Sequence, residues 1–492
     1  MSEWVDIPLA TQLAEENAGS SSYVSDAELV NLQLKENPPG SRAPFHIASV
    51  PTLSTTGVGA LPGSGRIRGI CVQRADAITG EPLVWLIRGT GAYYTSDLST
   101  WSASVGTVPN ANAYCRIIDA GNYVVSVDSI NTRAISTAGS FAASIEGMVD
   151  VAYQDGYTIY ADAGSDSVYV SSLDDPTTVG ALDFTTVDAL PGNIVGIVSD
   201  HRELYVLKSG SIEHYFNGGG AGFPFVRGSP GLIEKGCWNS GSPLYGVQTI
   251  AKLENSVFWV GDDMRVYMMR GYDPVPISNP WVEKYIIAYT PDSAGPRLLG
   301  NAFVLGGVPY YMISGFSDGG TETALVCDIK NRLWHKRNSP IATDLRLMFT
   351  CAFPNAAYFN TDRVVVTAED VSSGASTLYW LDPAGTNDSG AASQTNRVMT
   401  LPQFSPGGGA RRVFMPELYI DMQKAGAAGT LTLSWSDDGG ANYTGGVSGT
   451  ATNPRARFQR LGAFFQRILR FTFAINSRLE ITGVRARIEV GS

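Results

Sequence analysis

The sequence has little charge. Asp, Glu, Lys and Arg make up 16% of the 492 residues, against about 25% in typical soluble domains. Acidic residues outnumber basic ones by 46 to 35, which gives a formal net charge of −11. This balance disfavours a protein that grips nucleic acid through a basic surface. It is also the ordinary charge of a protein that stays in solution.

Export, disulfide and membrane signals are missing. The cysteines are odd in number, far apart and never in a CxxC pair, so we expect buried free thiols in a reducing compartment. The N-terminus has no basic segment followed by an apolar run, which predicts no secretory signal. No apolar stretch reaches the roughly 18 residues that a membrane span needs. The cysteines are Cys71, Cys115, Cys237, Cys327 and Cys351.

Motifs for catalysis and metal binding are also scarce. No two of the 4 histidines have metal-ligand spacing, and no Gly-rich loop precedes a phosphate-binding Lys. No Gly-x-Ser-x-Gly elbow has a convincing His partner. The acidic pairs Asp262-Asp263 and Asp437-Asp438 lie between strands beside Gly or Ser, where turn chemistry explains them. We therefore predict no catalytic, cofactor-binding or metal site and no enzyme activity.

Short apolar runs between turn residues are what the sequence has in abundance. In residues 253–286, an apolar run at 257–260 ends at Gly261, and a second at 266–269 ends before Gly271. β-Branched and aromatic residues between such turns predict a hairpin. We expect its aromatic residues Trp259 and Tyr267 to be core residues.

Comparable hairpins recur along the chain at a nearly constant spacing. Periods of about 40–50 residues built from four short strands indicate a β-propeller. A single blade is apolar on both faces, so it becomes stable only when other blades cover it. We expect about seven four-stranded blades over residues 61–385, and six if one unit is divided differently. The units start near residues 66, 113, 148, 193, 247, 300 and 346.

The two flanking regions lack this pattern. Residues 1–60 contain a short helical stretch at 7–17 and an alternating, strand-like stretch at 28–35. We predict an N-terminal arm that adds strands to another domain; a partly disordered tail is the alternative. Residues 386–492 begin within a small polar linker at 385–393 and continue with strand-like segments at hairpin spacing, which predicts a small β-sandwich that the arm completes. The predicted fold class is all-β.

One turn motif occurs twice. Residues 436–443 resemble the S-x-D-x-G-x-T-W turn of sialidases and other propellers, called the Asp-box, and residues 95–101 are a shortened copy. In such turns the Asp side chain accepts backbone N–H bonds, so the role is structural. A sialidase would also need clustered arginines and a nucleophile pair, which the sequence does not supply.

A group of arginines near the C-terminus alternates with large apolar residues. Exposed arginines beside aromatic residues are typical of protein–protein contacts. The alternative is an ordinary pair of strands with one solvated face. The candidate contact residues are Arg455, Arg457, Arg460, Arg467 and Arg470.

Several short blocks are similar to one protein family. The chain resembles the packaged-DNA stabilisation proteins, which form the tail hub, or nozzle, of short-tailed, podovirus-type bacteriophages. The similarity spans most of the chain in degenerate blocks. These are Val266-Tyr267 with Gly271-Tyr272, Pro274, Ile277-Ser278 and Val282-Glu283; Ser211-Ile212-Glu213 with Pro224-Phe225, Gly231 and Gly236-Cys237; residues 29–39 with Pro51-Thr52-Leu53 and Arg68-Gly69; and Arg460-Leu461-Gly462 with Arg467.

The resemblance implies a structural virion protein of the tail, assembled in the host cytoplasm, with no cofactor and no membrane span. It implies a hexameric ring below the portal and its adaptor, or head-completion, protein. Such a ring extends the channel for double-stranded DNA, retains packaged DNA and carries a needle, plug, spike or fibres. An acidic wall suits that channel, because it repels phosphates. The alternative is a carbohydrate-binding or glycosidase-like propeller that acts as a receptor-binding tail protein, although the Asp-box does not recur once per blade.

Overall fold

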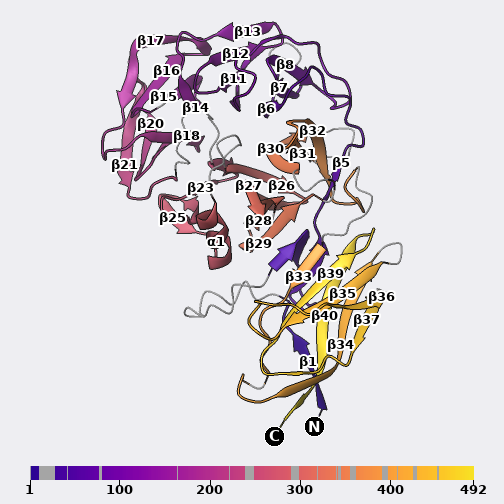
Figure 1. Ribbon diagram of the computed structural model, residues 1–492. Coiled ribbons are helices and arrows are strands. Elements are labelled where there is room, and N and C mark those ends of the chain that lie inside the picture. Colours follow the sequence, from indigo (N-terminus) through magenta and orange to yellow (C-terminus); the bar gives the residue numbers. More distant parts are fainter. Residues whose placement is uncertain are drawn as a thin grey trace.

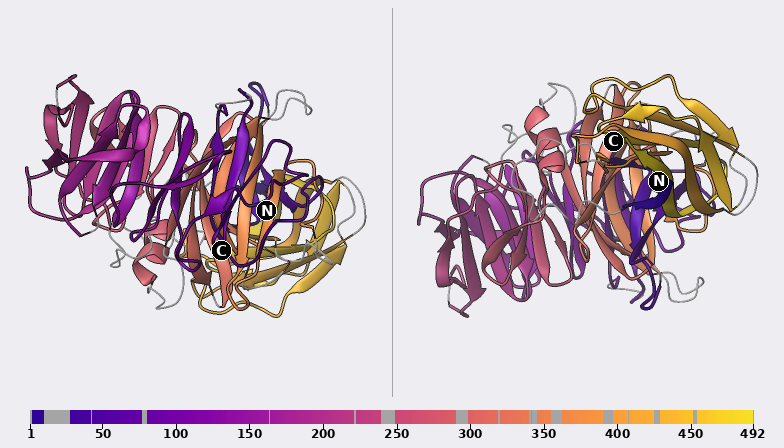
Figure 2. Two further views of the ribbon diagram at one scale, coloured as in Figure 1. Left: turned by 90° about the horizontal axis from the view of Figure 1, so that it is seen from above. Right: turned by 90° about the horizontal axis from the view of Figure 1, so that it is seen from below.

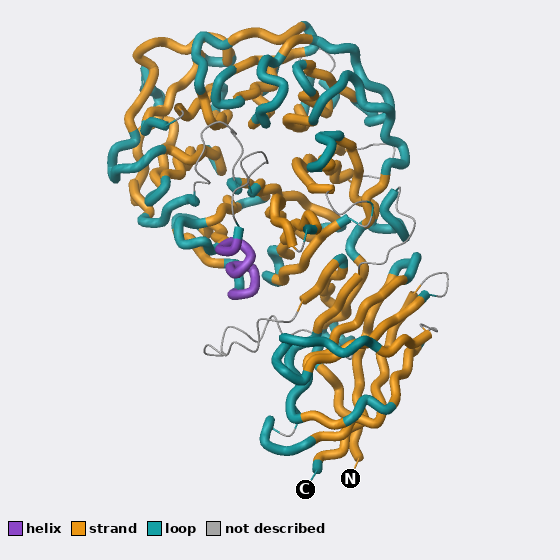
Figure 3. Tube along the Cα trace, viewed as in Figure 1, coloured by secondary structure: helices purple, strands orange, loops and turns teal. Residues whose placement is uncertain are grey.

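The computed structural model describes most of the chain. The described residues are 2–9, 28–41, 43–76, 80–162, 164–220, 222–238, 249–289, 298–318, 320–339, 341, 345–354, 362–389, 397–406, 408–424, 429–450 and 454–491. They form an all-β structure with one short helix, in which a ring of sheets adjoins a second, elongated body (Figures 1 and 3). No helix in these ranges is long and apolar enough to cross a membrane.

The ring is a β-propeller built from antiparallel units of four strands. Blade 1 contains β6 (Ile67–Gln73), β7 (Leu83–Arg88), β8 (Gly91–Thr95) and β9 (Gly106–Thr107); blade 2, β10 (Arg116–Ala120), β11 (Tyr123–Val127), β12 (Thr132–Ser136) and β13 (Gly139–Ala142). Blade 3 contains β14 (Met148–Gln154), β15 (Tyr157–Asp162), β16 (Ser167–Ser172) and β17 (Asp175–Thr186); blade 4, β18 (Ile194–Asp200), β19 (Glu203–Lys208), β20 (Ile212–Asn217) and β21 (Phe225–Ile233). Blade 5 contains β22 (Ala251–Leu253), β23 (Ser256–Val260), β24 (Val266–Arg270) and β25 (Asp273–Pro276); blade 6, β26 (Leu299–Leu305), β27 (Val308–Asp318), β28 (Thr321–Asp328) and β29 (Leu333–Asn338). Blade 7 contains β30 (Leu345–Pro354), β31 (Asp362–Asp370), β32 (Ser376–Asp382) and β5 (Thr52–Ser54).

The inner strands close the ring. Each of β6, β10, β14, β18, β22, β26 and β30 contacts the next, and β30 contacts β6. Six units are self-contained four-stranded sheets, and blade 6 belongs to a larger sheet of nine strands. Counted by inner strands, the described ring therefore has seven members, and the predicted propeller is confirmed.

Strand β5 fastens the ring. It precedes blade 1 in the sequence but pairs with β32, the last strand of blade 7, with Leu53 opposite Leu381. Blade 7 therefore contains strands from both ends of the propeller segment. Pairing across the two ends ties the ring shut, since neither blade 7 nor blade 1 can move away without breaking this ladder.

Neighbouring blades are held together by the apolar side chains that they bury against each other. Trp259 on β23 is fully buried, stacks on Tyr267 at 5.7 Å between ring centroids, and donates from Nε1 to the Gly236 carbonyl at 3.2 Å. Both aromatic residues are core residues, as expected. Blades 5 and 6 approach so closely that a Cβ at Gly300 would lie 1.9 Å from the Thr249 carbonyl oxygen, so only glycine fits there.

The second body is a β-sandwich. One sheet contains β1 (Ser2–Ile7), β3 (Leu32–Glu36), β4 (Phe45–Ser49), β40 (Leu479–Val490), β34 (Val413–Lys424), β37 (Arg455–Gln459) and β38 (Ala463–Phe464). The facing sheet contains β2 (Glu28–Val30), β33 (Arg397–Thr400), β39 (Ile468–Ala474), β35 (Thr430–Ser436) and β36 (Val447–Thr450). Their inward side chains, such as Leu418 and Val484 against Leu431 and Phe471, form one buried cluster.

The N-terminal strands join these two bodies. β2 pairs in parallel with β29 of blade 6 and antiparallel with β33 of the sandwich, so the nine-stranded sheet runs from one body into the other. Asn31, with a φ of 53°, interrupts the predicted strand at 28–35 and sends β3 into the opposite sheet. Both labelled chain ends lie at the sandwich (Figure 2). The domain limits at residues 60 and 385 stay a prediction.

The helix of the structure differs from that expected from the sequence. The segment after β25 contains α1 (Pro280–Ala288), a helix that was not predicted from the sequence. It begins where the Asn279 side chain accepts from the Val282 amide at 3.0 Å and Pro280 occupies the first turn. Trp281, Val282 and Ile286 bury its inner face. The helical stretch predicted at 7–17 is strand up to Ile7, and residues 10–17 lie outside the described residues.

Candidate functional site

The outer face of the first sandwich sheet is rich in arginine. Strand register aligns Trp4 with Arg487 and Glu417, and aligns Asp6 with Arg485, Tyr419 and Arg457. Because side chains alternate along a strand, all of these point away from the buried core. We call this surface the arginine face. Its members are Trp4, Asp6, Glu417, Tyr419, Asp421, Arg455, Arg457, Gln459, Arg485 and Arg487.

Ion pairs and ring contacts order the arginine face. The rings of Trp4 and Tyr419 stack at 5.1 Å, and the guanidinium carbons of Arg455 and Arg457 lie 4.9 and 5.8 Å from the Tyr419 ring centroid. Arg455 Nε lies 2.5 Å from Asp421 Oδ1. The hydrogen bond from Tyr419 to Glu417 raises the tyrosine pKa. Trp4 nevertheless remains 50% exposed. Exposed, pre-ordered aromatic and arginine side chains are those that dominate binding energy in protein interfaces.

A hollow adjoins this face. It has a volume of about 540 Å³ and shares Asp6, Asp421 and Arg485 with the arginine face. Its other walls are mostly apolar and include Pro8, Leu9, Ala43, Pro44, Phe45 and Val484. A hollow beside ordered aromatic and arginine side chains is suited to receive an anchoring side chain of a partner protein.

The structure separates the five predicted contact arginines. Arg455 and Arg457 lie on the arginine face, and Arg457 pairs with Glu417. Arg460 follows in an exposed turn, where its amide donates to the Pro416 carbonyl at 2.9 Å. Arg467 and Arg470 belong to other surroundings.

For Arg467 a contact role is wrong, because its side chain is buried. It is 2% exposed, pairs with Asp437 at 2.7 and 2.8 Å, and donates to the Leu461 carbonyl at 2.6 Å. Arg470 lies on β39 of the other sheet, with its guanidinium carbon 3.7 Å from the centroid of the Tyr443 ring. The sequence spacing did not reveal that β37 and β39 belong to different sheets.

Both Asp-box turns have the predicted structural role. Asp438 accepts from the Asn442 amide at 2.9 Å and from Ser436 Oγ at 2.6 Å, and these bonds lower its pKa to about 2. Asp97 likewise accepts from the amides of Ser99 and Thr100 at 2.9 and 2.8 Å. These carboxylates hold turns and are not arranged as a catalytic pair.

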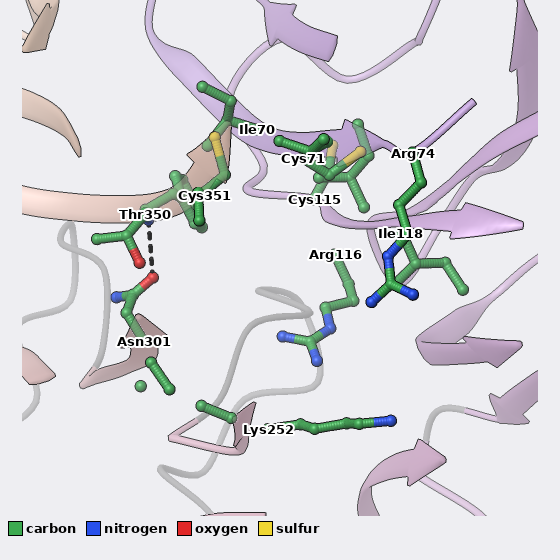
Figure 4. A pocket seen from close by; sticks show the side chains of 17 residues that line it. Ile70, Cys71, Arg74, Cys115, Arg116, Ile118, Lys252, Asn301, Thr350 and Cys351 are labelled. Atoms are coloured by element: carbon green, nitrogen blue, oxygen red, sulfur yellow. Dashed lines mark hydrogen bonds between the residues drawn. The ribbon is translucent and has the colours of Figure 1, made fainter. Parts of the chain in front are cut away.

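A second hollow lies on the propeller axis. It has a volume of about 620 Å³ and is lined by the inner strands of blades 1, 2, 5, 6 and 7, with Cys71, Cys115 and Cys351 in its wall (Figure 4). Burial raises the pKa of Cys115 and of Cys351 to about 12. These thiols therefore stay protonated at neutral pH and are poor nucleophiles and metal ligands. In the described ranges no group of three or more His, Cys, Asp or Glu residues is arranged to hold a metal ion.

Solved structures similar in shape are distant. One is the extracellular domain of the putative hybrid two component system BT4673 from B. thetaiotaomicron, with 12% identity, a TM-score of 0.42 and coverage of 67% of this chain and 39% of that chain. Another is BBS1N in complex with ARL6DN, with 10% identity, a TM-score of 0.41 and coverage of 69% and 98%. The chain thus spans well under two thirds of the first. No curated protein matches the sequence.

The family comparison is more informative. A sequence model described as "Bacteriophage P22 Gp10, beta-propeller" matches residues 49–297, which is just over half of the chain. The matched residues run from β5 through blade 5, so the match falls on the propeller itself. It supports a structural, DNA-stabilising role in a phage particle and favours a non-enzymatic protein. The chain belongs to the family of the bacteriophage P22 Gp10 propeller, the phage DNA stabilisation proteins.

Proposed function

We propose that this chain is a tail hub, or nozzle, protein of a short-tailed phage. In this role it extends the DNA channel below the portal and its adaptor, retains packaged DNA and carries the needle, plug or fibres. The observation that carries the proposal is the family match on a closed propeller that a continuous sheet joins to a second body.

The architecture suits a part that bears load. The propeller has no open seam, because β5 ties blade 7 to the segment before blade 1. The sandwich is attached by main-chain ladders on both sides of β2, and not by a flexible linker alone. At the same junction Arg337, which is 6% exposed, pairs with Asp388 at 3.4 Å. A spacer of this kind transmits force between its ends with little internal movement.

The arginine face is the proposed contact with a neighbouring copy or with the adaptor. The chain carries a net charge of −11, so most of its outer surface favours basic partners. The arginine face instead has four arginines and three carboxylates around Trp4 and Tyr419, and this small positive excess favours an acidic surface, whether on a second copy or on another protein. Copies repeated around an axis through one such heterologous contact close into a ring, and we propose six copies.

Electron microscopy of the assembled particle tests the proposal. We expect the purified full-length chain, alone or mixed with its adaptor protein, to form six-fold rings with an open axis. Light scattering measures the mass of the same samples. A chain that stays monomeric and also fails to join the adaptor would contradict the proposal.

The double substitution Arg455→Glu with Arg457→Glu tests the contact face. Two reversed charges at a desolvated contact should abolish assembly, while the circular dichroism spectrum of the monomer is retained. Arg202→Glu is a matched control, because Arg202 is 79% exposed and paired to Asp155 on the propeller. Rings that assemble equally well in the double variant would remove the arginine face from the proposal.

A further inference from the structure

The hollow on the propeller axis has charge of one sign. Seventeen residues line it, and the charged ones are Arg74, Arg116 and Lys252, from blades 1, 2 and 5. No carboxylate is among these lining residues, although acidic residues predominate in the chain as a whole. A concave surface lined by one sign of charge concentrates ions of the opposite sign.

Arg116 is the central basic group of this hollow. It opens β10, its side chain is 25% exposed, and in Figure 4 it extends into the hollow beside Arg74. Its Nε lies 3.4 Å from Asp150 Oδ1 and, in the described part of the chain, has no hydrogen-bond partner. Asp150 is itself held by the amides of Val151 and Ile197 at 2.8 and 2.9 Å. The carboxylate therefore holds the buried Nε of Arg116 from behind, while the partly exposed side chain extends into the hollow.

A polar residue on the opposite wall has a hydroxyl group with no partner in the described ranges. Thr350 on β30 lines the hollow, and its buried Oγ1 has no hydrogen-bond partner among the described residues. The Thr350 amide donates to Asn301 Oδ1 at 3.0 Å, and Asn301 Nδ2 donates to the Met348 carbonyl at 2.8 Å. Figure 4 shows this pair facing the basic side chains across the hollow. Buried polar groups are nearly always paired, so the unpaired Thr350 hydroxyl beside the hollow points to a ligand or ordered water.

The two other basic residues are anchored at the edge of the hollow. Lys252 Nζ donates to the Ser199 carbonyl at 2.6 Å and lies 3.4 Å from Asp200. Arg74 is exposed, and its amide donates to Asp119 Oδ2 at 3.0 Å. Three cationic groups on three blades thus line one hollow.

We propose that the axial hollow binds a small anion with two or more phosphate or carboxylate groups. Arg116 binds one group and Arg74 and Lys252 bind another, while the Thr350 hydroxyl donates from the opposite wall. A volume of about 620 Å³ lies within the roughly 300–1,000 Å³ of small-molecule sites. A carboxylate is planar and a phosphate is tetrahedral, but each presents two oxygens that can accept parallel hydrogen bonds from one guanidinium group. The proposal does not depend on ring assembly.

Isothermal titration calorimetry of the full-length chain tests this site. The probes are inorganic pyrophosphate and citrate, titrated separately at constant ionic strength, so that the two arms identify the preferred group. We expect saturable binding with one anion per chain. We expect Arg116→Gln to weaken binding about tenfold or more, because it removes charged hydrogen bonds.

Two further variants keep the test decisive. Arg116→Gln leaves Asp150 without its cation and can impair folding, whereas Arg74→Gln with Lys252→Gln changes groups at the edge of the hollow. This double variant should also weaken binding about tenfold. Arg202→Gln, outside the hollow, should bind like the wild type. The proposal is overturned if neither anion binds at about 10 mM, or if the double variant binds as tightly as Arg202→Gln.

Discussion

The most demanding test of the propeller is a single arginine buried between blades 1 and 2. Arg68 on β6 is fully buried, and its Nη2 lies 2.7 Å from Asp128 Oδ2 of blade 2. Its other guanidinium nitrogens donate to the carbonyls of Ala113, Gly89 and Val108 at 2.5, 3.0 and 2.8 Å. One side chain therefore satisfies three backbone acceptors and a carboxylate where two blades meet. Arg68→Met retains most of the volume and removes all four interactions.

The expected loss of stability follows from the carboxylate and the three carbonyls that lose Arg68 as their partner. Removing one partner of a buried ion pair costs about 3–5 kcal/mol, because the other charge is left uncompensated. Asp128 keeps the amides of Ile130 and Asn131 at 3.1 and 2.7 Å, which offsets part of that cost. Three carbonyls also lose their donor, and each unsatisfied group adds about 1–3 kcal/mol unless water enters. We therefore expect Arg68→Met to lower the free energy of unfolding by at least about 3 kcal/mol.

Urea unfolding followed by tryptophan fluorescence measures the effect. Arg202→Met is the matched control, since Arg202 Nε lies 2.9 Å from Asp155 but the side chain is 79% exposed. An exposed pair contributes about 0–1 kcal/mol. Adding Asp128→Asn to Arg68→Met removes the stranded charge and should recover part of the loss. If Arg68→Met is no more destabilising than Arg202→Met, the reasoning about buried charge at this blade interface is refuted.

Three further predictions concern the core, a backbone contact and acid stability. Trp259→Ala should cost about 3–5 kcal/mol in urea unfolding, because it empties a fully buried site between blades; unchanged stability would contradict its core placement. Gly300→Ala should lower the free energy of unfolding by about 1–3 kcal/mol, because its Cβ would overlap the Thr249 carbonyl. Gly210→Ala is the control: its Cβ would meet open space, so calorimetry should show nearly unchanged stability. Burial lowers the pKa of His335 to about 3 from 6.5, so the unfolded chain binds that proton first and stability falls as the pH drops from 6.5 towards 3. The free energy of unfolding, measured between pH 6.5 and 3, should fall less steeply in His335→Gln, by up to about 1.4 kcal/mol per pH unit. A slope equal to that of the wild type would exclude His335 as the source of the loss.

The sequence predicted those parts of the fold that rest on local pattern. Alternating apolar runs between Gly-rich turns are visible within each blade, because a strand and its hairpin partner lie within a few residues of each other. Trp259 and Tyr267 were placed in the core on the same grounds. Helix α1 was not predicted, although Asn279 and Pro280 are a capping signal.

Long-range pairing is what the sequence did not reveal. β5 has three residues, too few for a period, and its partner β32 lies more than 320 residues away. Two members of the arginine face, Trp4 and Arg487, lie opposite each other only because β1 pairs with β40. Arg467 shares the alternating pattern of Arg455 and Arg457, yet its burial depends on packing between two sheets. Such positions are set by tertiary contacts, which a local pattern does not encode.

Because β5 completes blade 7, the propeller ring can close only after both β5 and β32 have been synthesised. Residues 52–54 leave the ribosome first, but their partner strand ends at residue 382. At about 5–20 residues per second, β5 waits for tens of seconds with its backbone groups unpaired. The strands β1 and β40 are separated still further along the chain. During this interval β5 is unpaired on every nascent copy. Pairing of β5 with β32 of another copy therefore competes with closure of the ring within one chain.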